Sequence, residues 1–219
     1  MNSMFLYSYR LESVDVDGFE TGNVTDMGSM FYSCGDLTAL NVSGWDTSRV
    51  TDMGSMFYGC ENLSELDVSG FHTENVADMS SMFQRCESLS ELDVSGFDTS
   101  GAVDINGMFH GCSGLRELDV SGFDISSADD IGWMFYGCSG LSTLDVSGWE
   151  VSHVSDMENI FEKCAFRTAP VFASSGGSDD EETAVSGGAV ILQDPDSFFH
   201  DMLVRDADMT TDTGGMIPL

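Results

Sequence analysis

Residues 78–103, with the sequence DMSSMFQRCESLSELDVSGFDTSGAV, contain one complete copy of a pattern that recurs through most of the chain. Every cysteine of the protein is 26 residues from the next one, and Phe, Leu, Gly and Asp residues keep the same step. The cysteines are Cys34, Cys60, Cys86, Cys112, Cys138 and Cys164. A fixed step of this size is typical of stacked structural repeats.

The first part of the repeat has helical periodicity. Met79, Met82, Phe83 and Cys86 are spaced i, i+3, i+4 and i+7, which favours one buried stripe on a short helix. Asp78 comes directly before this stripe, where its carboxylate could accept hydrogen bonds from the free amides of a first helical turn. The pattern therefore predicts a helix that begins at each repeat's aspartate, and we assign these aspartates a structural role.

The second part of the repeat has the alternation of a strand. Leu92 and Val94 alternate with polar residues, and the pair Ser95 and Gly96 then interrupts the pattern. One helix and one strand in 26 residues cannot bury their own apolar faces, so neighbouring repeats must share a core. We therefore expect an α/β solenoid, a right-handed stack of short parallel strands and short helices.

Two sequence patterns carry a resemblance to a known family. The stretches L-x-x-L-D-V-S-G-F and D-M-x-x-M-F-x-x-C resemble the BspA-type leucine-rich repeat family of bacterial surface proteins, over residues 1 to about 165. The resemblance implies a curved, leucine-rich-repeat-like domain. It also implies a location at the cell surface or outside the cell, and a role in adhesion to host or matrix proteins. The first ten residues show no secretion signal, which favours the alternative of a cytoplasmic, intracellular protein-interaction scaffold.

The repeat pattern divides the chain into three parts. Residues 1–172 hold about six and a half repeats, and the register fails after Cys164. Residues 173–189 are rich in Gly and Ser and acidic, as expected for a flexible linker. In residues 190–219, Pro195 could open a short helix that caps the last repeat or docks on a partner.

The composition of the 219 residues narrows the class of partner. The chain has 7 Lys and Arg against 38 Asp and Glu, a formal net charge of -31. Nucleic acids and anionic lipid surfaces are bound through basic residues, so we expect neither, and the apolar runs are too short for membrane insertion. The charge is spread along the chain, which also suggests adaptation to a saline habitat.

The residues with reactive side chains all follow the repeat. We expect the cysteines to be core thiols rather than disulfides or zinc ligands, and the methionines beside each Phe to fill the core. No nucleophile, base and orienting acid stand out, and no phosphate-binding glycine loop follows a strand. We therefore expect a non-enzymatic protein without catalytic residues, metal ligands or cofactors.

One row of aspartates and serines is the strongest candidate for partner binding. It lies at outward positions of the predicted strands, and we expect it on a concave face. The row comprises Asp67, Asp93, Asp119, Asp145, Ser69, Ser95, Ser121 and Ser147. Strands about 4.8 Å apart would align like charges, which need compensation from the serine hydroxyls, from counterions or from a protein partner that is basic or cation-bridged. The alternative is a solvated acidic face with no binding role.

A second candidate surface follows the phenylalanine of each repeat. Its residues are Tyr32, Tyr58, Gln84, His110 and Tyr136. Tyrosine is common at interfaces, although packing beside the helix explains the same residues. Trp133 takes a slot that holds serine in three earlier repeats, so it could expose a large apolar group at the outer edge.

Overall fold

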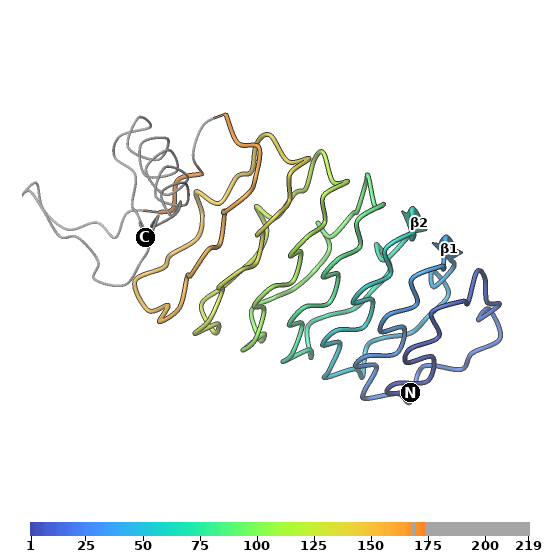
Figure 1. Cartoon of the computed structure of the whole chain (residues 1–219). Helices are drawn as coiled ribbons and strands as arrows, with labels where there is room; N and C mark the ends of the chain where they lie inside the picture. The colour runs from blue at the N-terminus through green and yellow to red at the C-terminus, as the bar shows by residue number, and fades with distance from the viewer. Residues whose placement is uncertain (168–169, 174–219) are drawn as a thin grey trace, which may run out of the picture.

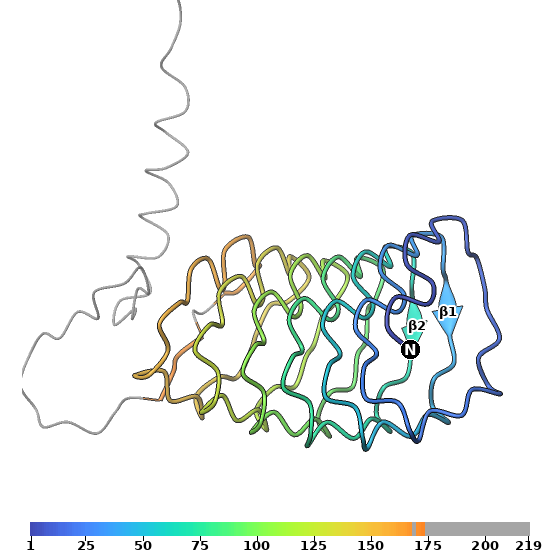
Figure 2. The ribbon, with the colours of Figure 1, turned by 90° about the horizontal axis from the view of Figure 1, so that it is seen from below.

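The computed structural model describes residues 1–167 and 170–173, which wind into a row of similar loops lying side by side (Figures 1 and 2). The row begins with the blue N-terminal loops at one end, and neither view shows a marked curvature. Parallel bridges join the equivalent aspartates of successive repeats: Asp26, Asp52, Asp78, Asp104, Asp130 and Asp156. Each loop of the row is therefore one repeat of the sequence.

Two short strands lie where the sequence predicts extended chain. Strand β1 is Ala39–Leu40 and strand β2 is Glu65–Leu66. They pair in parallel, with Ala39 opposite Glu65 and Leu40 opposite Leu66. Among the described residues, the later repeats have no further strand in this slot.

The predicted short helices are absent from the described residues, and the segment after Asp78 is a series of turns. In an α-helix each amide donates to the carbonyl four residues earlier. Here the amide of Met82 donates to the oxygen of Met79, three residues back, at 3.3 Å. The amide of Phe83 instead donates to Met108 of the next repeat, at 2.9 Å. The amides that would donate within a helix therefore donate either to local turns or to the next repeat.

Left-handed backbone explains why no helix forms. Ser81 and Arg85 have φ angles of 54° and 61°, and residues in that region interrupt a right-handed helix. The equivalent positions of other repeats are mostly serine or glycine: Ser29, Ser33, Ser55, Gly59, Gly107, Gly111 and Gly137. The apolar spacing correctly predicts which side chains are buried, but consecutive turns satisfy that spacing as well as a helix does.

The core contains a column of phenylalanine rings that runs through the row. The ring centroids of Phe57 and Phe83 are 5.7 Å apart, and those of Phe83 and Phe109 are also 5.7 Å apart. These rings are fully buried, and each is stacked nearly parallel to its neighbours. Like side chains therefore lie in register from repeat to repeat, and the methionines beside them are buried as expected.

The cysteines form a second column, and all six are free thiols. The Sγ–H of Cys112 donates to the carbonyl oxygen of Phe83 at 3.0 Å, and each of the others makes the same bond to the preceding repeat. Burial raises the pKa of Cys34 to about 11 and that of Cys112 to about 12. The thiols are thus protonated core groups at neutral pH.

The C-terminal end of the described row is partly covered by apolar side chains. The ring of Phe172 stacks on Phe161 at 5.7 Å, and Phe166 meets the same ring edge-on at 5.6 Å. The predicted linker, apart from residue 173, and the predicted tail helix lie outside the described residues. None of the described residues belongs to a helix with the length and apolar character needed to cross a membrane.

Candidate functional site

The aspartate–serine row defined above is exposed on the segment that follows the strand slot of each repeat. In every pair the serine hydroxyl donates to Oδ1 of the aspartate two residues earlier, at 2.7 Å. The backbone amide of the same serine donates to the same oxygen, at 3.0–3.1 Å. The expected hydrogen bonds from serine to carboxylate are therefore present in all four pairs.

These bonds favour the charged form of three of the carboxylates, those of Asp67, Asp119 and Asp145. The hydrogen bond from the hydroxyl of Ser69 has the larger effect and the bond from its backbone amide the smaller one, and together they hold the pKa of Asp67 below its ordinary value. The corresponding serines lower the pKa of Asp119 and Asp145 in the same way. Both donors go to Oδ1, and within the described residues no side chain donates to Oδ2 of any of the four aspartates. One carboxylate oxygen per repeat can therefore accept a hydrogen bond from a partner.

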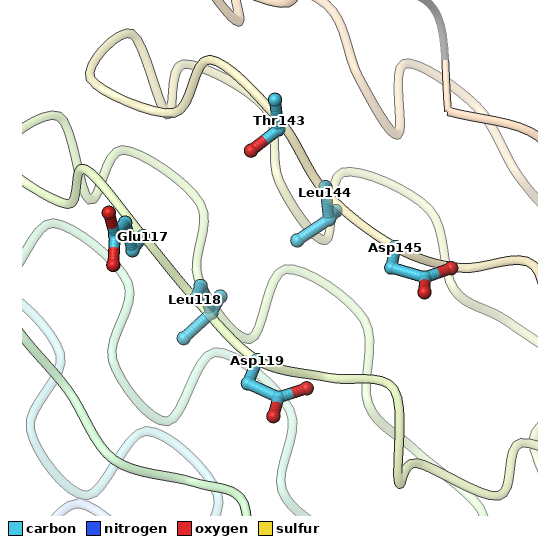
Figure 3. Close-up of a pocket in the computed structure, with 6 residues that line it drawn as sticks. All are labelled: Glu117, Leu118, Asp119, Thr143, Leu144 and Asp145. Atoms are coloured by element: carbon cyan, nitrogen blue, oxygen red, sulfur yellow. The ribbon is translucent and has the colours of Figure 1, made fainter.

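A shallow hollow lies between two neighbouring pairs of the row (Figure 3). Leu118 and Leu144 line it, and the carboxylates of Asp119 and Asp145 project on the same side of the two chain segments. Small-molecule sites are usually enclosed clefts that bury most of their ligand. This open surface suits a side chain or backbone segment of a larger partner better than a small substrate.

The expected concave face is not evident, because the row of loops is close to straight in both views (Figures 1 and 2). Among the described residues, the ion pairs are those of Arg85 with Glu61 at 2.6 Å and with Glu87 at 3.7 Å. Neither involves the aspartate–serine row. The carboxylates of the row are thus stabilised by hydrogen bonds from serine, and within the described residues no basic side chain neutralises their charge.

The structure contains a second row of hydrogen-bonded aspartates and serines, which was not among the candidates predicted from the sequence. Ser48 and Ser100 donate their hydroxyls to Asp46 and Asp98, each at 2.6 Å. These hydroxyls, followed by the serine amides, hold the pKa of both carboxyls below its usual range. The signal was visible in the sequence of four repeats, where an acidic residue directly follows Trp45, Phe97, Phe123 or Trp149 and a serine stands two positions later.

The aspartates at the start of each repeat have a structural role, although they cap turns instead of helices. Oδ1 of Asp52 accepts from the amide of Gly54 at 2.9 Å, and Asp104 accepts from Asn106 at 3.1 Å. Burial raises the pKa of both Asp52 and Asp104, and neighbouring aspartates of the column add to the shift. In the part of the chain that the structure describes, no three His, Cys, Asp or Glu side chains are placed to hold a metal ion.

The tyrosine-containing row lies along the turns of successive repeats. The rings of Tyr32 and Tyr58 stack with centroids 4.4 Å apart. Nε2 of Gln84 is 3.2 Å from Nδ1 of His110, and that imidazole lies 4.9 Å from the ring of Tyr136. Trp133, for which the sequence predicts an exposed side chain because serine holds its position in three earlier repeats, is 38% exposed. These residues therefore contact one another from repeat to repeat and leave part of their surface open.

Comparison with known proteins gives one family. The family described as Mycoplasma protein of unknown function, DUF285, matches residues 1–112 and again residues 64–171. No curated protein and no solved structure matches the chain. The two overlapping matches cover the repeats.

Proposed function

The chain belongs to the DUF285 family of Mycoplasma proteins of unknown function, and we propose that it is a non-enzymatic protein-binding module built as a solenoid of 26-residue repeats. The observation that carries the proposal is the aspartate–serine row. It offers four exposed, charged and oriented carboxylates at one fixed step along the molecule. Such a surface matches an extended partner better than a compact ligand.

A basic protein is the partner that this surface favours. The row adds aligned negative charge to a chain whose formal net charge is already -31. Complementary charge speeds encounter and selects the partner's register more than it adds affinity. Arginine is well suited to the row, because its guanidinium can donate two hydrogen bonds to one carboxylate. A cation could also bridge the row to a partner of lower charge.

The chemistry of the reactive side chains supports a non-enzymatic class. Each serine hydroxyl of the row donates to a carboxylate, and the pKa of Asp67, Asp119 and Asp145 is lowered, so these carboxylates are weak bases for removing the hydroxyl proton. Burial raises the pKa of the cysteine thiols, whereas a catalytic cysteine needs a lowered one. Each of these residues has a role in the repeat itself.

Two settings are compatible with this module. The resemblance to BspA-type repeats favours an adhesin-like protein at the cell surface that binds host or matrix proteins. The free thiols favour an intracellular interaction scaffold, because disulfides form in oxidising compartments and are rare in the cytosol. We place the surface role first and retain the scaffold as the alternative.

The test compares three full-length baits. One is the wild type, one carries Asp93→Asn and Asp119→Asn, and the control carries Asp36→Asn and Glu74→Gln. Asn retains an Oδ1 that can accept the serine bonds, so the row variant should fold. The control removes the same charge at exposed residues outside the row.

Each bait is incubated at one ionic strength with extracellular matrix proteins and with a bacterial cytosolic extract. Proteins that bind the wild type and the control but are lost from the row variant support the proposal, and the extract that supplies them decides between the two settings. Equal capture by all three baits, or equal loss from both variants, would contradict a role for the row.

A further inference from the structure

Trp133 has a backbone conformation that its side chain disfavours. Its φ angle is 60°, in the left-handed region that bulky residues rarely adopt. The same slot in the other repeats has equally positive φ angles and holds small or polar residues: Ser29, Ser55, Ser81, Gly107 and Asn159. The residue is still 38% exposed, so burial of its indole offsets the strain only in part. Strain of this kind is most often retained where it serves a function.

The indole belongs to a compact aromatic cluster, which we define as Trp133, Tyr136 and His110. The rings of Trp133 and Tyr136 have centroids 4.9 Å apart, and those of Trp133 and His110 are 5.9 Å apart. Burial, followed by the charges of Arg85 and Lys163, lowers the pKa of His110. The imidazole is therefore neutral at neutral pH, so the cluster presents three uncharged π-systems to solvent.

A cation already lies on this cluster. Nζ of Lys163 is 4.8 Å from the centroid of the Tyr136 ring, which is a cation–π distance. Lys163 is the only lysine of the chain and is itself exposed. The face of the Tyr136 ring thus attracts a positively charged side chain, and a cation from a partner would take the place of Lys163 there.

We propose that the aromatic cluster is a binding site for a cationic side chain, an arginine or lysine, presented by a basic partner protein. The inference rests on the protein-binding function proposed above and adds the group that is recognised and the residues that recognise it. The net charge of -31 attracts basic proteins to the molecule over long range, whereas Arg85 and Lys163 are positive charges close to the cluster. At short range a cationic occupant is therefore supported by the aromatic faces themselves, on which the ammonium of Lys163 already lies. Aromatic rings also stack on sugars, and the experiment includes that outcome.

The experiment uses the fluorescence of the full chain. Trp45 and Trp149 are 5% and 1% exposed, so a soluble ligand at the cluster changes mainly the emission of Trp133. The probes are a short peptide with a single arginine, the same peptide with neutral citrulline in its place, and a hexamer of N-acetylglucosamine. The variant is Trp133→Ser, which restores the residue that three other repeats carry at this slot and leaves the net charge unchanged. Its binding is measured by calorimetry alongside the wild type.

We expect the wild type to bind the arginine peptide roughly twofold to thirtyfold more tightly than Trp133→Ser, the range given by a cation–π contact. Lys163→Gln should bind the peptide more tightly than the wild type, because it removes the competing cation. Equal affinity of the wild type and Trp133→Ser, equal binding of the citrulline peptide, or weaker binding by Lys163→Gln would overturn the proposal. Binding of the sugar hexamer in preference to the peptide, lost in Trp133→Ser, would overturn it in favour of a carbohydrate site.

The two proposals fail separately. Asp93→Asn with Asp119→Asn should reduce capture of protein partners and leave the difference between the wild type and Trp133→Ser for the arginine peptide unchanged. If Trp133→Ser binds the peptide like the wild type while the row variant still loses partners, the function stands and this inference is wrong. If the row variant keeps all partners, the role of the row is wrong whatever the peptide shows.

Discussion

The Sγ–H of Cys112 donates to the carbonyl oxygen of Phe83, 29 residues earlier in the chain, at 3.0 Å. The bond joins two repeats inside the core, where both residues are fully buried. Because the same bond recurs at each cysteine, the thiols form a column beside the phenylalanine rings. The cysteines are therefore structural donors between repeats.

We predict that the thiols react only when the protein unfolds. Burial raises the pKa of Cys112 to about 12, so at a pH of about 8 almost none of it is thiolate, the form that attacks alkylating reagents. Iodoacetamide followed by mass spectrometry should find native protein almost unmodified and denatured protein modified at all six cysteines. Rapid labelling of Cys112 in the native protein would contradict the burial seen here.

Thr99 supplies a second bond between repeats, and its removal should destabilise the fold. Its Oγ1 donates to the carbonyl of Asp124 at 2.8 Å and accepts from the amide of the same residue at 2.8 Å. Thr99→Val keeps the shape and leaves both backbone groups without this partner, which should lower the free energy of unfolding by about 1–3 kcal/mol. Thr99→Ser retains the hydroxyl and is the control. Urea unfolding of the three proteins measures the difference, and a valine variant as stable as the wild type would show that water replaces the bond.

The repeat step and the buried set could be predicted from the sequence, because both follow directly from apolar spacing. Phe83 and Cys86 are buried as that spacing predicts. The error at this segment was the helix, since buried residues at i, i+3, i+4 and i+7 also fit successive turns. The left-handed φ angles of Ser81 and Arg85 distinguish successive turns from a helix. Neither serine nor arginine is typical of such an angle, so the sequence alone does not predict it.

The candidate site was predicted in part for a similar reason. The bond from Ser95 to Asp93 follows from a spacing of two residues that is visible in the sequence. In the cluster around Trp133, His110 contacts Trp133 and Tyr136 of the next repeat, and the orientation of these rings depends on turns that the apolar spacing did not predict. Local hydrogen bonds were therefore predictable, and side-chain contacts across repeats were predictable only for the core columns.

Two half-buried aspartates at the start of their repeats, Asp52 and Asp104, should make the protein more stable as the pH falls from neutral. Burial raises the folded-state pKa of Asp52 and Asp104 above the ordinary value of 3.8, so the folded protein binds these protons more readily than the unfolded chain does. The folded protein therefore becomes more stable as the pH falls through the raised pKa values towards 3.8. This added stability is lost when the pH rises back through the same values. The exposed carboxyls of Asp67 and Asp119, whose pKa is lowered, act in the opposite sense at still lower pH.

Asp52→Asn with Asp104→Asn tests these two aspartates. Asn keeps an Oδ1 that can accept from the amides of Gly54 and Asn106, and it removes the half-buried charge. The variant should melt at a higher temperature than the wild type at a pH of about 7, and its melting temperature should change less as the pH falls from neutral towards 3.8, the ordinary pKa of aspartate. Thermal unfolding followed by circular dichroism gives both quantities. A variant that is less stable at neutral pH would mean that the charged form of these aspartates is required.

The acidic rows should make stability depend on salt. With a formal net charge of -31, the folded protein holds carboxylates closer together than the unfolded chain does. Charges interact over roughly 30 Å at about 0.01 M salt and over roughly 3 Å at about 1 M. The unfolding temperature should therefore rise with sodium chloride across this range, as the hypothesis of a saline habitat requires.

The control is a variant with Asn at four positions: Asp67, Asp93, Asp119 and Asp145. Its unfolding temperature should rise less with salt, because salt strengthens hydrophobic burial equally in both proteins but screens fewer charges in the variant. An equal rise in the two proteins would show that the effect comes from hydrophobic burial. No rise in the wild type would contradict the hypothesis of a saline habitat.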